Sequence, residues 1–487
     1  MTTGKLTLVT SRQPAHLGKT YRLTASGLEK RTAGQMINGS FEVLAFADVQ
    51  GLAQVLGQVS TSQAISASLP KNGSLQGTLV TKAEKVNHHG ALARSKDDFV
   101  LAAGQPGVLI LDYDPPAGVV PLDREQLWEA LLEVAPGLAS AGVIWWCSGS
   151  SLIYHGQDQI QGLVGQRIYV LVQDLADTER FGEVLFKRLW LAGHGRVEIS
   201  KAGSLLSRCL FDQAMHQPAR LDFGGAVCEA PLEQRRGQPV ILSEGGFLDT
   251  RAALPGLTDV DQARFEDMLE AAKLKAAPEA EKIKALWQSE RVPALVERLV
   301  KAGVSTDQAT ERAERTLASA QRGVLLGDFE VQLDSGETVT VGAILDDRAR
   351  FHGHLTKDPL EPGYQNGKTC GKLYLFGSSP ILTSRAHGGK TFRLMRQPSR
   401  LYLQKGGKAG LVDQIIDRLG HEPDLFLKGG IPVRIENGEA RPLFKHALSH
   451  TIQSRIALFS RNDKGQDIPV DLPGDVVEMV MALLGVN

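Results

Sequence analysis

This chain of 487 residues has few cysteines, no long apolar run and almost no net charge. The four cysteines lie far apart and form no CxxC pair, which excludes the usual spacing of a zinc site or redox motif, so we interpret them as packing thiols. No apolar run of about 18 residues is present, so no membrane span is expected. The N-terminal MTTGKLTLVTSRQ lacks the apolar segment of a secretion signal, which leaves the cytoplasm as the expected location. Because the formal net charge is −1, contacts with a polyanion must come from local basic patches.

The length predicts several domains, since one domain usually takes about 100–200 residues. The first part alternates apolar runs with helical patterns, as an α/β or α+β domain does. The next part is rich in Ala, Glu, Lys and Arg at amphipathic spacing and predicts a helical bundle. Short strand patterns (FEVQL, TVTVGAIL) come next, and the last part ends on the apolar helix VVEMVMALLGV. We therefore predict an α+β protein with domains at 1–245, 246–325, 326–397 and 398–487.

Five local patterns organise the first domain. GVLILDYDPP is a buried-type strand that two prolines end, and VIWWCSGSS and GQRIYVLVQD are further strands rich in β-branched and aromatic residues. DREQLWEALLEV predicts a helix with Asp123 as its N-cap and Gln126 three residues later. TERFGEVLFKRLWLAGHG predicts a second helix with Phe181, Leu185 and Leu189 on one face.

The sharpest chemical signal is Asp112-Tyr113-Asp114 at the end of the run VLIL. Side chains two residues apart on a strand share a face, so both carboxylates point the same way and Tyr113 points the other way. Two such carboxylates repel each other, and a site built this way usually holds a divalent cation; Mg²⁺ and Mn²⁺ prefer oxygen ligands. A solvated strand end or an Asp-Pro-Pro turn also fits these residues, and glycosyltransferases and phosphohydrolases carry DxD pairs too.

The order of the following segments resembles the archaeo-eukaryotic primase superfamily. SGSS from Ser148 follows one strand, GQRIYV begins the next, and RCLFDQ brings Asp212 after the strand-like RVEIS. Members of that superfamily carry an acidic pair at the end of an apolar strand, a Ser-x-His element and a third acidic residue on a later strand. The resemblance implies an RRM-like catalytic core that transfers nucleotides on a DNA template. In it, the catalytic residues Asp112, Asp114 and Asp212 bind two Mg²⁺ or Mn²⁺ ions that support the transfer. Asp222 in ARLDF is a weaker candidate for the third acid.

Arg167 stands where these relatives carry the histidine that faces the phosphates of the nucleotide. A guanidinium can clamp a phosphate bidentately, but it cannot shuttle a proton near neutral pH. His155 in LIYHG is an alternative proton carrier, although a single loop histidine is more often a surface residue. The resemblance implies that nucleoside triphosphates are held by Ser148, Ser150, Arg167 and Lys201.

Basic residues flank these motifs, and each one alone fits a solvated surface charge. Together they can neutralise the phosphates of a single-stranded DNA template. The residues in question are Arg94, Lys96, Arg196 and Arg208.

A second resemblance covers the region after the predicted helices. DPLEPGYQNGKTCGKLYLF followed by SRAHGG is similar to the segment that links primase and helicase parts in phage and mobile-element replication proteins. The C-terminal part is similar to the adaptor that precedes a viral-type hexameric ATPase, which implies a hexameric helicase module as a partner. That module is absent from this chain, so either the protein acts without it or the chain is a fragment. GYQNGKT is one residue short of a Walker A loop and leads into a strand pattern, so we do not interpret it as one.

Three functions fit these residues. The first is a DNA primase-polymerase of a phage or mobile element. The second is a catalytically degenerate primase-like domain that binds single-stranded DNA and couples it to a helicase or origin, which Arg167 supports. The third, a DxD glycosyltransferase, explains the acidic pair but not the later segments. The pairs His352/His354 and His88/His89 have no acidic or cysteine partner in the sequence, so metal binding is not predicted for them.

Overall fold

The computed structural model of the chain divides into two compact units. The first comprises Met1–Ile199 with Leu205–Pro278, and the second comprises Ser200–Ser204 with Glu279–Asn487. The finer division into four domains stays a prediction. The structure describes residues 2–33, 36–82, 84–116, 118–376, 379–397, 399–404, 406–420, 425–436, 439–461 and 467–486.

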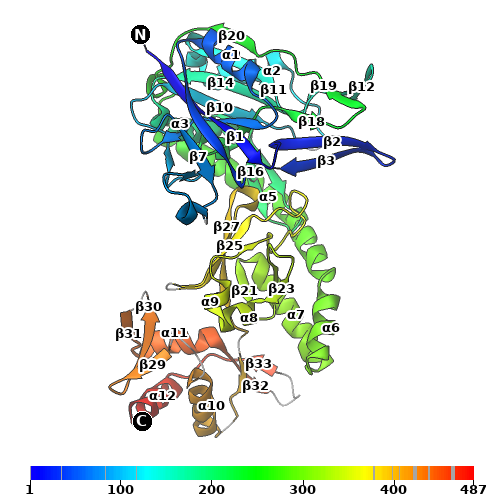
Figure 1. The fold of residues 1–487 in the computed structure, drawn as a ribbon. Coiled ribbons are helices and arrows are strands. Elements are labelled where there is room, and N and C mark those ends of the chain that lie inside the picture. Colours follow the sequence, from blue (N-terminus) through cyan, green and yellow to red (C-terminus); the bar gives the residue numbers. More distant parts are fainter. Residues whose placement is uncertain are drawn as a thin grey trace. The chain divides into compact units, whose positions relative to one another are not determined.

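The first unit is built on a ten-stranded mixed sheet (Figure 1). Eight strands follow the order β20-β11-β14-β10-β1-β4-β7-β8, while β5 pairs with β1 and β17 pairs with β5. The strands are β1 (Gly4–Gln13), β4 (Asn38–Phe46), β5 (Gln63–Ser66), β7 (Gln76–Val80), β8 (Leu92–Ala93), β10 (Gly107–Tyr113), β11 (Gly142–Cys147), β14 (Gln166–Val172), β17 (Asp222–Phe223) and β20 (Val240–Glu244). The helices of this unit include α1 (Val49–Gln58), α2 (Arg124–Val134), α3 (Thr178–Leu191) and α4 (Thr250–Ala253). The chain is therefore a mixed α+β protein, as its sequence predicts.

Both faces of the central strands are covered. Leu109 and Leu111 of β10 share a buried cluster with residues of α2 and α3, whereas Val108 and Ile110 share another with residues of α1. All seven residues of β10 are buried. A strand covered on both faces needs apolar residues at every position, which explains its unbroken apolar run.

The two predicted helices of the first unit are confirmed. The Asp123 carboxylate accepts from the backbone N–H of Gln126, whose side chain accepts in turn from the N–H of Asp123, so α2 begins with a capping box. Phe181, Leu185 and Leu189 are buried along α3, as their spacing predicts.

Smaller sheets extend from the large one. A three-stranded sheet has the order β18-β2-β3, and another has the order β13-β12-β19. In Figure 1, β2 and β3 project from the large sheet as a two-stranded arm. The bounds are β2 (Gly18–Thr24), β3 (Gly27–Ala33), β12 (Ile153–His155), β13 (Asp158–Gln161), β18 (Ala226–Cys228), β19 (Leu232–Gln234), β6 (Leu69–Pro70), β9 (Phe99–Val100), β15 (Arg196–Ile199) and β16 (Leu205–Arg208).

The second unit combines helices with a five-stranded sheet of order β21-β27-β26-β25-β24. Its strands are β21 (Val324–Leu326), β24 (Leu355–Thr356), β25 (Gly371–Tyr374), β26 (Ile381–Ser384) and β27 (Lys390–Met395), with β22 (Glu330–Gln332) and β23 (Thr338–Thr340) in a separate hairpin. The helices are α5 (Asp259–Ser289), which begins in the first unit, α6 (Val292–Lys301), α7 (Thr306–Gln321), α8 (Val341–Asp346) and α9 (Arg348–Phe351). The helical pattern between residues 259 and 320 is thus confirmed.

One strand prediction in this unit is wrong. TVTVGAIL was expected to be a strand throughout, but only Thr338–Thr340 is one, and Val341–Asp346 forms α8. The Thr340 hydroxyl accepts from the N–H of Ala343 at 3.2 Å. This N-cap starts a helix where the β-branched residues favoured a strand.

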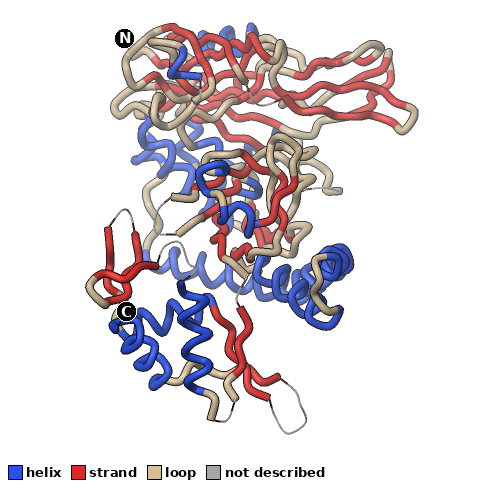
Figure 2. Tube along the Cα trace, turned by 60° about the horizontal axis from the view of Figure 1, so that its bottom comes forward, coloured by secondary structure: helices blue, strands red, loops and turns tan. Residues whose placement is uncertain are grey.

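The C-terminal part of the second unit has its own buried cluster, which includes Leu411, Ile415, Ile452 and Val476. Figure 2 shows its helices and strands by colour. Its elements are β28 (Ser399–Tyr402), α10 (Lys408–Gly420), β29 (Leu425–Lys428), β30 (Ile431–Glu436), β31 (Glu439–Pro442), α11 (Lys445–Arg455), β32 (Ile456–Arg461), β33 (Asp467–Pro469) and α12 (Gly474–Val486). The predicted C-terminal helix is confirmed as α12. Throughout the described part of the chain, every helix is too short or too polar to cross a bilayer.

Candidate functional site

The acidic pair lies at the carboxyl end of β10, in the middle of the large sheet. Asp112 is buried, with 9% of its surface exposed, and Asp114 lies just beyond the strand and is exposed. Tyr113 belongs to the cluster on the α2 and α3 face, and its hydroxyl accepts from the N–H of Leu122 at 2.9 Å.

Arg167 contacts two buried carboxylates. It stands directly opposite Asp112 in the β10–β14 pairing, and its Nη1 donates to Asp112. Its Nε donates to Asp222 Oδ1 at 2.9 Å, and the Tyr169 hydroxyl donates to Asp222 Oδ2 at 2.6 Å. Both oxygens of Asp222 are thereby used. Across the described residues, Nη2 of Arg167 has no hydrogen-bond partner.

The charges at this strand end strongly influence one another. Burial raises the pKa of Asp112 to about 7; Arg167 opposes this rise, and Asp114, Asp222 and Asp212 add to it. Burial works against the charge of Arg167, but the carboxylates around it outweigh burial and raise its pKa, so it stays protonated. Negative charge is thus in excess around Asp112, an environment that favours a further cation.

The side chains of Asp114, Ser148 and Ser150 all lie next to the Cα of Gly165. A methyl group added to Gly165 would lie 2.6 Å from Asp114 Oδ1, 3.1 Å from Ser150 Oγ and in contact with Ser148 Oγ. The two serine hydroxyls are hydrogen-bonded to each other at 2.7 Å, and the N–H of Ser148 donates to the Gly165 carbonyl at 2.8 Å. Three of the predicted site residues are therefore close together, and the absence of a side chain at Gly165 makes room for them.

Asp212 is attached to the same strand end through its backbone. Its N–H donates to the Asp112 carbonyl at 2.9 Å, next to an antiparallel bridge between Tyr113 and Phe211. Its side chain is exposed and accepts from the N–H of Ala214 at 3.0 Å. Asp212 and Asp222 therefore differ in kind, since one carboxylate is accessible and the other is used by Arg167 and Tyr169.

Lys19 is a neighbour that the sequence did not suggest. It lies on β2 beside Ala226, and the Gly225–Ala226 backbone packs against Gly149, between the two serines. Burial lowers the pKa of Lys19, while the nearby carboxylate of Asp114 opposes this. Lys19 forms no ion pair within the described part of the chain. Only the pairing of β2 with β18 brings it here, so no local motif could have revealed it.

The oxygen donors fit Mg²⁺ or Mn²⁺ by type. As the side chains stand, however, no three His, Cys, Asp or Glu residues of the described ranges are grouped closely enough to hold a metal ion. A metal ion held here would require the exposed carboxylates of Asp114 and Asp212 to turn toward Asp112. Asp112 itself would have to share its carboxylate with, or release it from, Arg167.

The other predicted residues either contact different groups or are exposed. Lys201 is exposed and belongs to the second unit. Arg196 and Arg208 both pair with Glu198, and Arg94 donates to the Ala219 carbonyl at 3.1 Å. The exposed residues also include Lys96 and His155, the latter at the end of β12.

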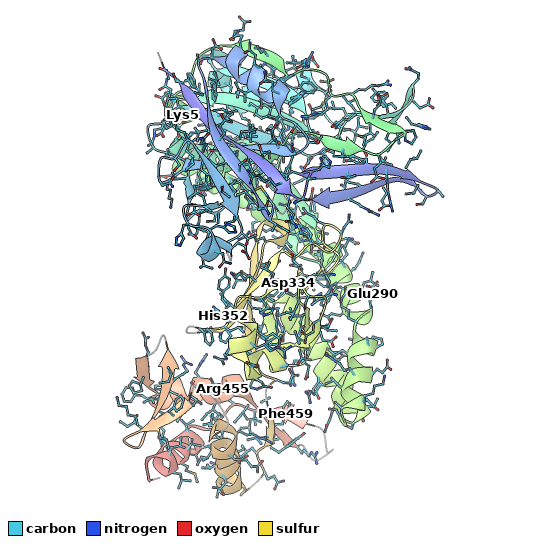
Figure 3. All side chains as sticks on the ribbon, viewed as in Figure 1. Lys5, Glu290, Asp334, His352, Arg455 and Phe459 are labelled. Carbon is cyan, nitrogen blue, oxygen red and sulfur yellow. The ribbon has the colours of Figure 1, made fainter. Side chains whose placement is uncertain are left out.

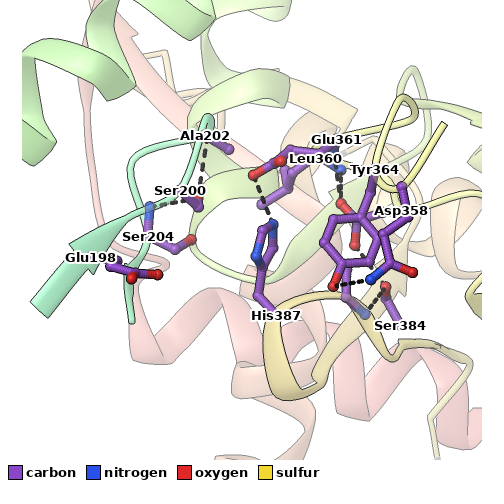
Figure 4. A network of polar contacts seen from close by, with 12 residues as sticks. Glu198, Ser200, Ala202, Ser204, Asp358, Leu360, Glu361, Tyr364, Ser384 and His387 are labelled. Atoms are coloured by element: carbon purple, nitrogen blue, oxygen red, sulfur yellow. Dashed lines mark hydrogen bonds and ion pairs between the residues drawn. The ribbon is translucent and has the colours of Figure 1, made fainter. Parts of the chain in front are cut away.

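A second polar network lies in the second unit (Figure 4). It joins the two parts of the segment that resembles a primase–helicase linker. Asp358 accepts from the hydroxyl of Ser384 at 2.6 Å and from the N–H of Glu361 at 2.7 Å. Glu361 pairs with His387 at 3.0 Å. These bonds fold the loop back on itself. The Walker-like stretch leads into β25, a strand rather than a helix, as predicted.

No protein-family model, no curated protein and no solved structure matches this chain.

Proposed function

We propose that the first unit is a nucleotidyltransferase of the archaeo-eukaryotic primase type, which joins nucleotides on a DNA template. One observation carries the proposal: Asp112, Asp114 and Asp212 lie at one strand end. Ser148, Ser150 and Lys19 surround it with hydroxyls and a positive charge. Phosphoryl-type transfer needs carboxylates that bind a metal cation next to hydrogen-bond donors and positive charge that bind the phosphates.

The order of the elements supports the same proposal. β10, α2, β11, β14 and α3 come in this order along the chain, with β12 and β13 inserted between β11 and β14. The three strands lie in the order β11-β14-β10, and residues of both helices share one buried cluster. This agrees with the β-α-β-β-α part of an RRM-like fold. β20 departs from it, because it pairs beside β11 rather than beside β10.

In this proposal each residue has a separate task. A bound divalent cation would supply charge neutralisation at the transferred phosphate and a lower pKa for the attacking hydroxyl. Lys19 and the serine hydroxyls orient the triphosphate. Arg167 holds Asp112 and Asp222 in position, and its Nη2 remains available to a phosphate oxygen. Arg167 is therefore a positioning residue first and a phosphate ligand second.

The test is incorporation of labelled nucleotide on a single-stranded template with Mg²⁺ or Mn²⁺. Asp114→Asn and Asp212→Asn should each lower the rate by about a hundredfold or more, because a charge that acts in the transition state is lost. Lys19→Met should weaken nucleotide binding about tenfold and leave DNA affinity unchanged, since an ammonium contact to phosphate is lost. Full activity of Asp114→Asn would refute the metal assignment.

A second candidate is favoured by the contact between Arg167 and Asp112. If that pair never opens, the first unit is a primase-like domain without catalysis that binds single-stranded DNA. Template binding without incorporation under either metal would support it, and an Arg167→His variant that gains incorporation would identify the arginine as the cause. A helicase partner and a role in phage or mobile-element replication belong to the proposal as well and rest on the resemblance of the linker segment.

A further inference from the structure

The five-stranded sheet of the second unit has one buried face and one accessible face. Leu373, Leu382, Phe392 and Leu394 point into a buried cluster and are at most 3% exposed. Because side chains alternate along a strand, the residues between them lie on the opposite face. That outward face includes Leu355, Lys372, Tyr374, Ile381, Thr383, Thr391 and Arg393, and Phe376 follows two residues after Tyr374, just past the end of β25.

Aromatic rings cluster at the accessible face. Tyr374 is 40% exposed and Phe376 is 62% exposed, although rings of this size are usually covered. The imidazole of His352 packs against Phe376, with 4.7 Å between ring centroids, and lies 6.5 Å from Tyr374. The N–H of Leu375 donates to His352 Nδ1 at 3.0 Å, which fixes the imidazole at the edge of the cluster. Figure 3 labels His352.

Positive charge lies in the same rows as the rings. The ammonium of Lys372 lies over the Tyr374 ring, 5.6 Å from its centroid. Tyr374 pairs with Ile381, and Ile381 pairs with Arg393, so Tyr374 and Arg393 stand in one row with their backbones two strands apart, about 10 Å. Neither cation pairs with a carboxylate of the described residues. The seven outward positions and Phe376 include no acidic residue, and Asp334 lies at the edge beyond Leu355.

We propose that this face binds single-stranded nucleic acid, with Tyr374 and Phe376 stacking on unpaired bases and Lys372 and Arg393 contacting phosphates. Exposed rings beside unpaired cations are the combination that sequence-tolerant single-strand binding requires. A duplex hides the faces of its bases, so these rings favour the single strand. A purely apolar protein partner would leave both cations without a counter-charge. This surface belongs to the second unit, and the proposal does not depend on catalysis in the first unit.

The test uses the full chain and fluorescence anisotropy with labelled oligothymidine of about 20 nucleotides. The double variant Tyr374→Ala/Phe376→Ala should bind about ten- to a hundredfold more weakly, because base stacking is lost. Tyr374→Phe keeps the ring and should bind within about twofold of the parent chain. Phe426→Ala removes a ring that is 52% exposed on another sheet and should change nothing.

A salt titration distinguishes the contribution of charge to binding from that of base stacking. The double variant Lys372→Gln/Arg393→Gln should bind more weakly and show a shallower dependence on salt between about 50 and about 200 mM. The aromatic double variant should keep the parent's salt dependence. Ultraviolet cross-linking of an iodouridine-containing oligonucleotide should label the peptide that contains Tyr374 and Phe376.

Three results would overturn the proposal. The first is unchanged oligothymidine affinity in a folded aromatic double variant, and the second is a parent chain that binds no single strand at low salt. The third is a parent chain that dimerises in light scattering while the aromatic double variant is monomeric, since this face would then join two copies of the chain.

Discussion

At the scale of single residues, the candidate site depends on the absence of a side chain at Gly165. Its backbone conformation is not one reserved for glycine, so the requirement is one of space alone. Ser148, Ser150 and Asp114 fill the volume that a methyl group would take. Backbone stability and site geometry can therefore be separated experimentally at this position.

Gly165→Ala should lower nucleotide incorporation by about a hundredfold, because it displaces Asp114 and both serine hydroxyls from their positions. Gly256→Ala is the matched control, since a methyl group there would meet no atom within 4 Å. Rates for both variants on one template decide the question. Equal activity of the two variants would mean that this group of hydroxyls takes no part in the reaction.

His216 gives a prediction for stability against pH. It is 5% exposed, packs against Gly182 of α3, and burial lowers its pKa to about 4 from an ordinary 6.5. The unfolded chain therefore binds a proton at a higher pH than the folded chain does, so stability falls as pH drops below 6.5. Between about pH 7 and about pH 5 the loss should be about 2 kcal/mol, and His216→Leu should abolish that part of it. Urea unfolding at both pH values measures the difference; an identical pH dependence in the variant would exclude His216 as its source.

At the scale of elements, the spacing of apolar residues predicted the main helices and strands of the first unit. It could not predict the register in which the strands pair. The apolar runs gave β10 and β14, and the capping residues gave α2. The contact of Arg167 with Asp112 depends on which residues of two strands stand opposite each other, and a shift by one residue would turn Arg167 to the other face. Asp222 lies on β17, which pairs with β5, and Lys19 lies on β2, which pairs with β18. A motif contains only residues near one another in sequence. It could therefore suggest Asp222 as an acid but could not predict its contact with Arg167 or the position of Lys19.

Side-chain contacts among β10, β14 and β17 predict how the two candidate third acids, Asp212 and Asp222, differ. Asp222→Asn should lower the free energy of unfolding by about 3 kcal/mol, because Arg167 and Tyr169 lose a buried carboxylate. Asp212→Asn should change stability by less than about 1 kcal/mol, since its carboxylate is exposed, yet should lower incorporation by about a hundredfold or more. Denaturant unfolding and activity measured on both variants separate structure from catalysis. If Asp222→Asn keeps full stability and loses activity, the third acid is Asp222.

At the scale of the whole molecule, the first compact unit continues into the helical region of the sequence. The change to Ala, Glu, Lys and Arg begins near residue 259, and the sequence predicts a first domain at 1–245 and a helical domain at 246–325. The two compact units divide at Pro278, inside α5. Amphipathic spacing identifies the buried face of a helix and does not identify the core that covers it.

The first turns of α5 should therefore stabilise the first unit. Phe265 is 7% exposed and packs edge-on against Phe186 and Trp190 of α3, with ring centroids 6.2 and 6.3 Å away. Phe265→Ala should lower the stability of the first unit by about 3 kcal/mol, because it leaves a cavity beside two large rings. A shortened chain that ends at residue 278 should unfold cooperatively and keep nucleotide binding, whereas one that ends at residue 258 should show a stability loss at least as large as that of Phe265→Ala. Leu274→Ala, at a position that is 67% exposed on the same helix, is the control and should have little effect. Equal stability of the two shortened chains would mean that α5 adds nothing to this core, and that the first unit ends before the helix begins.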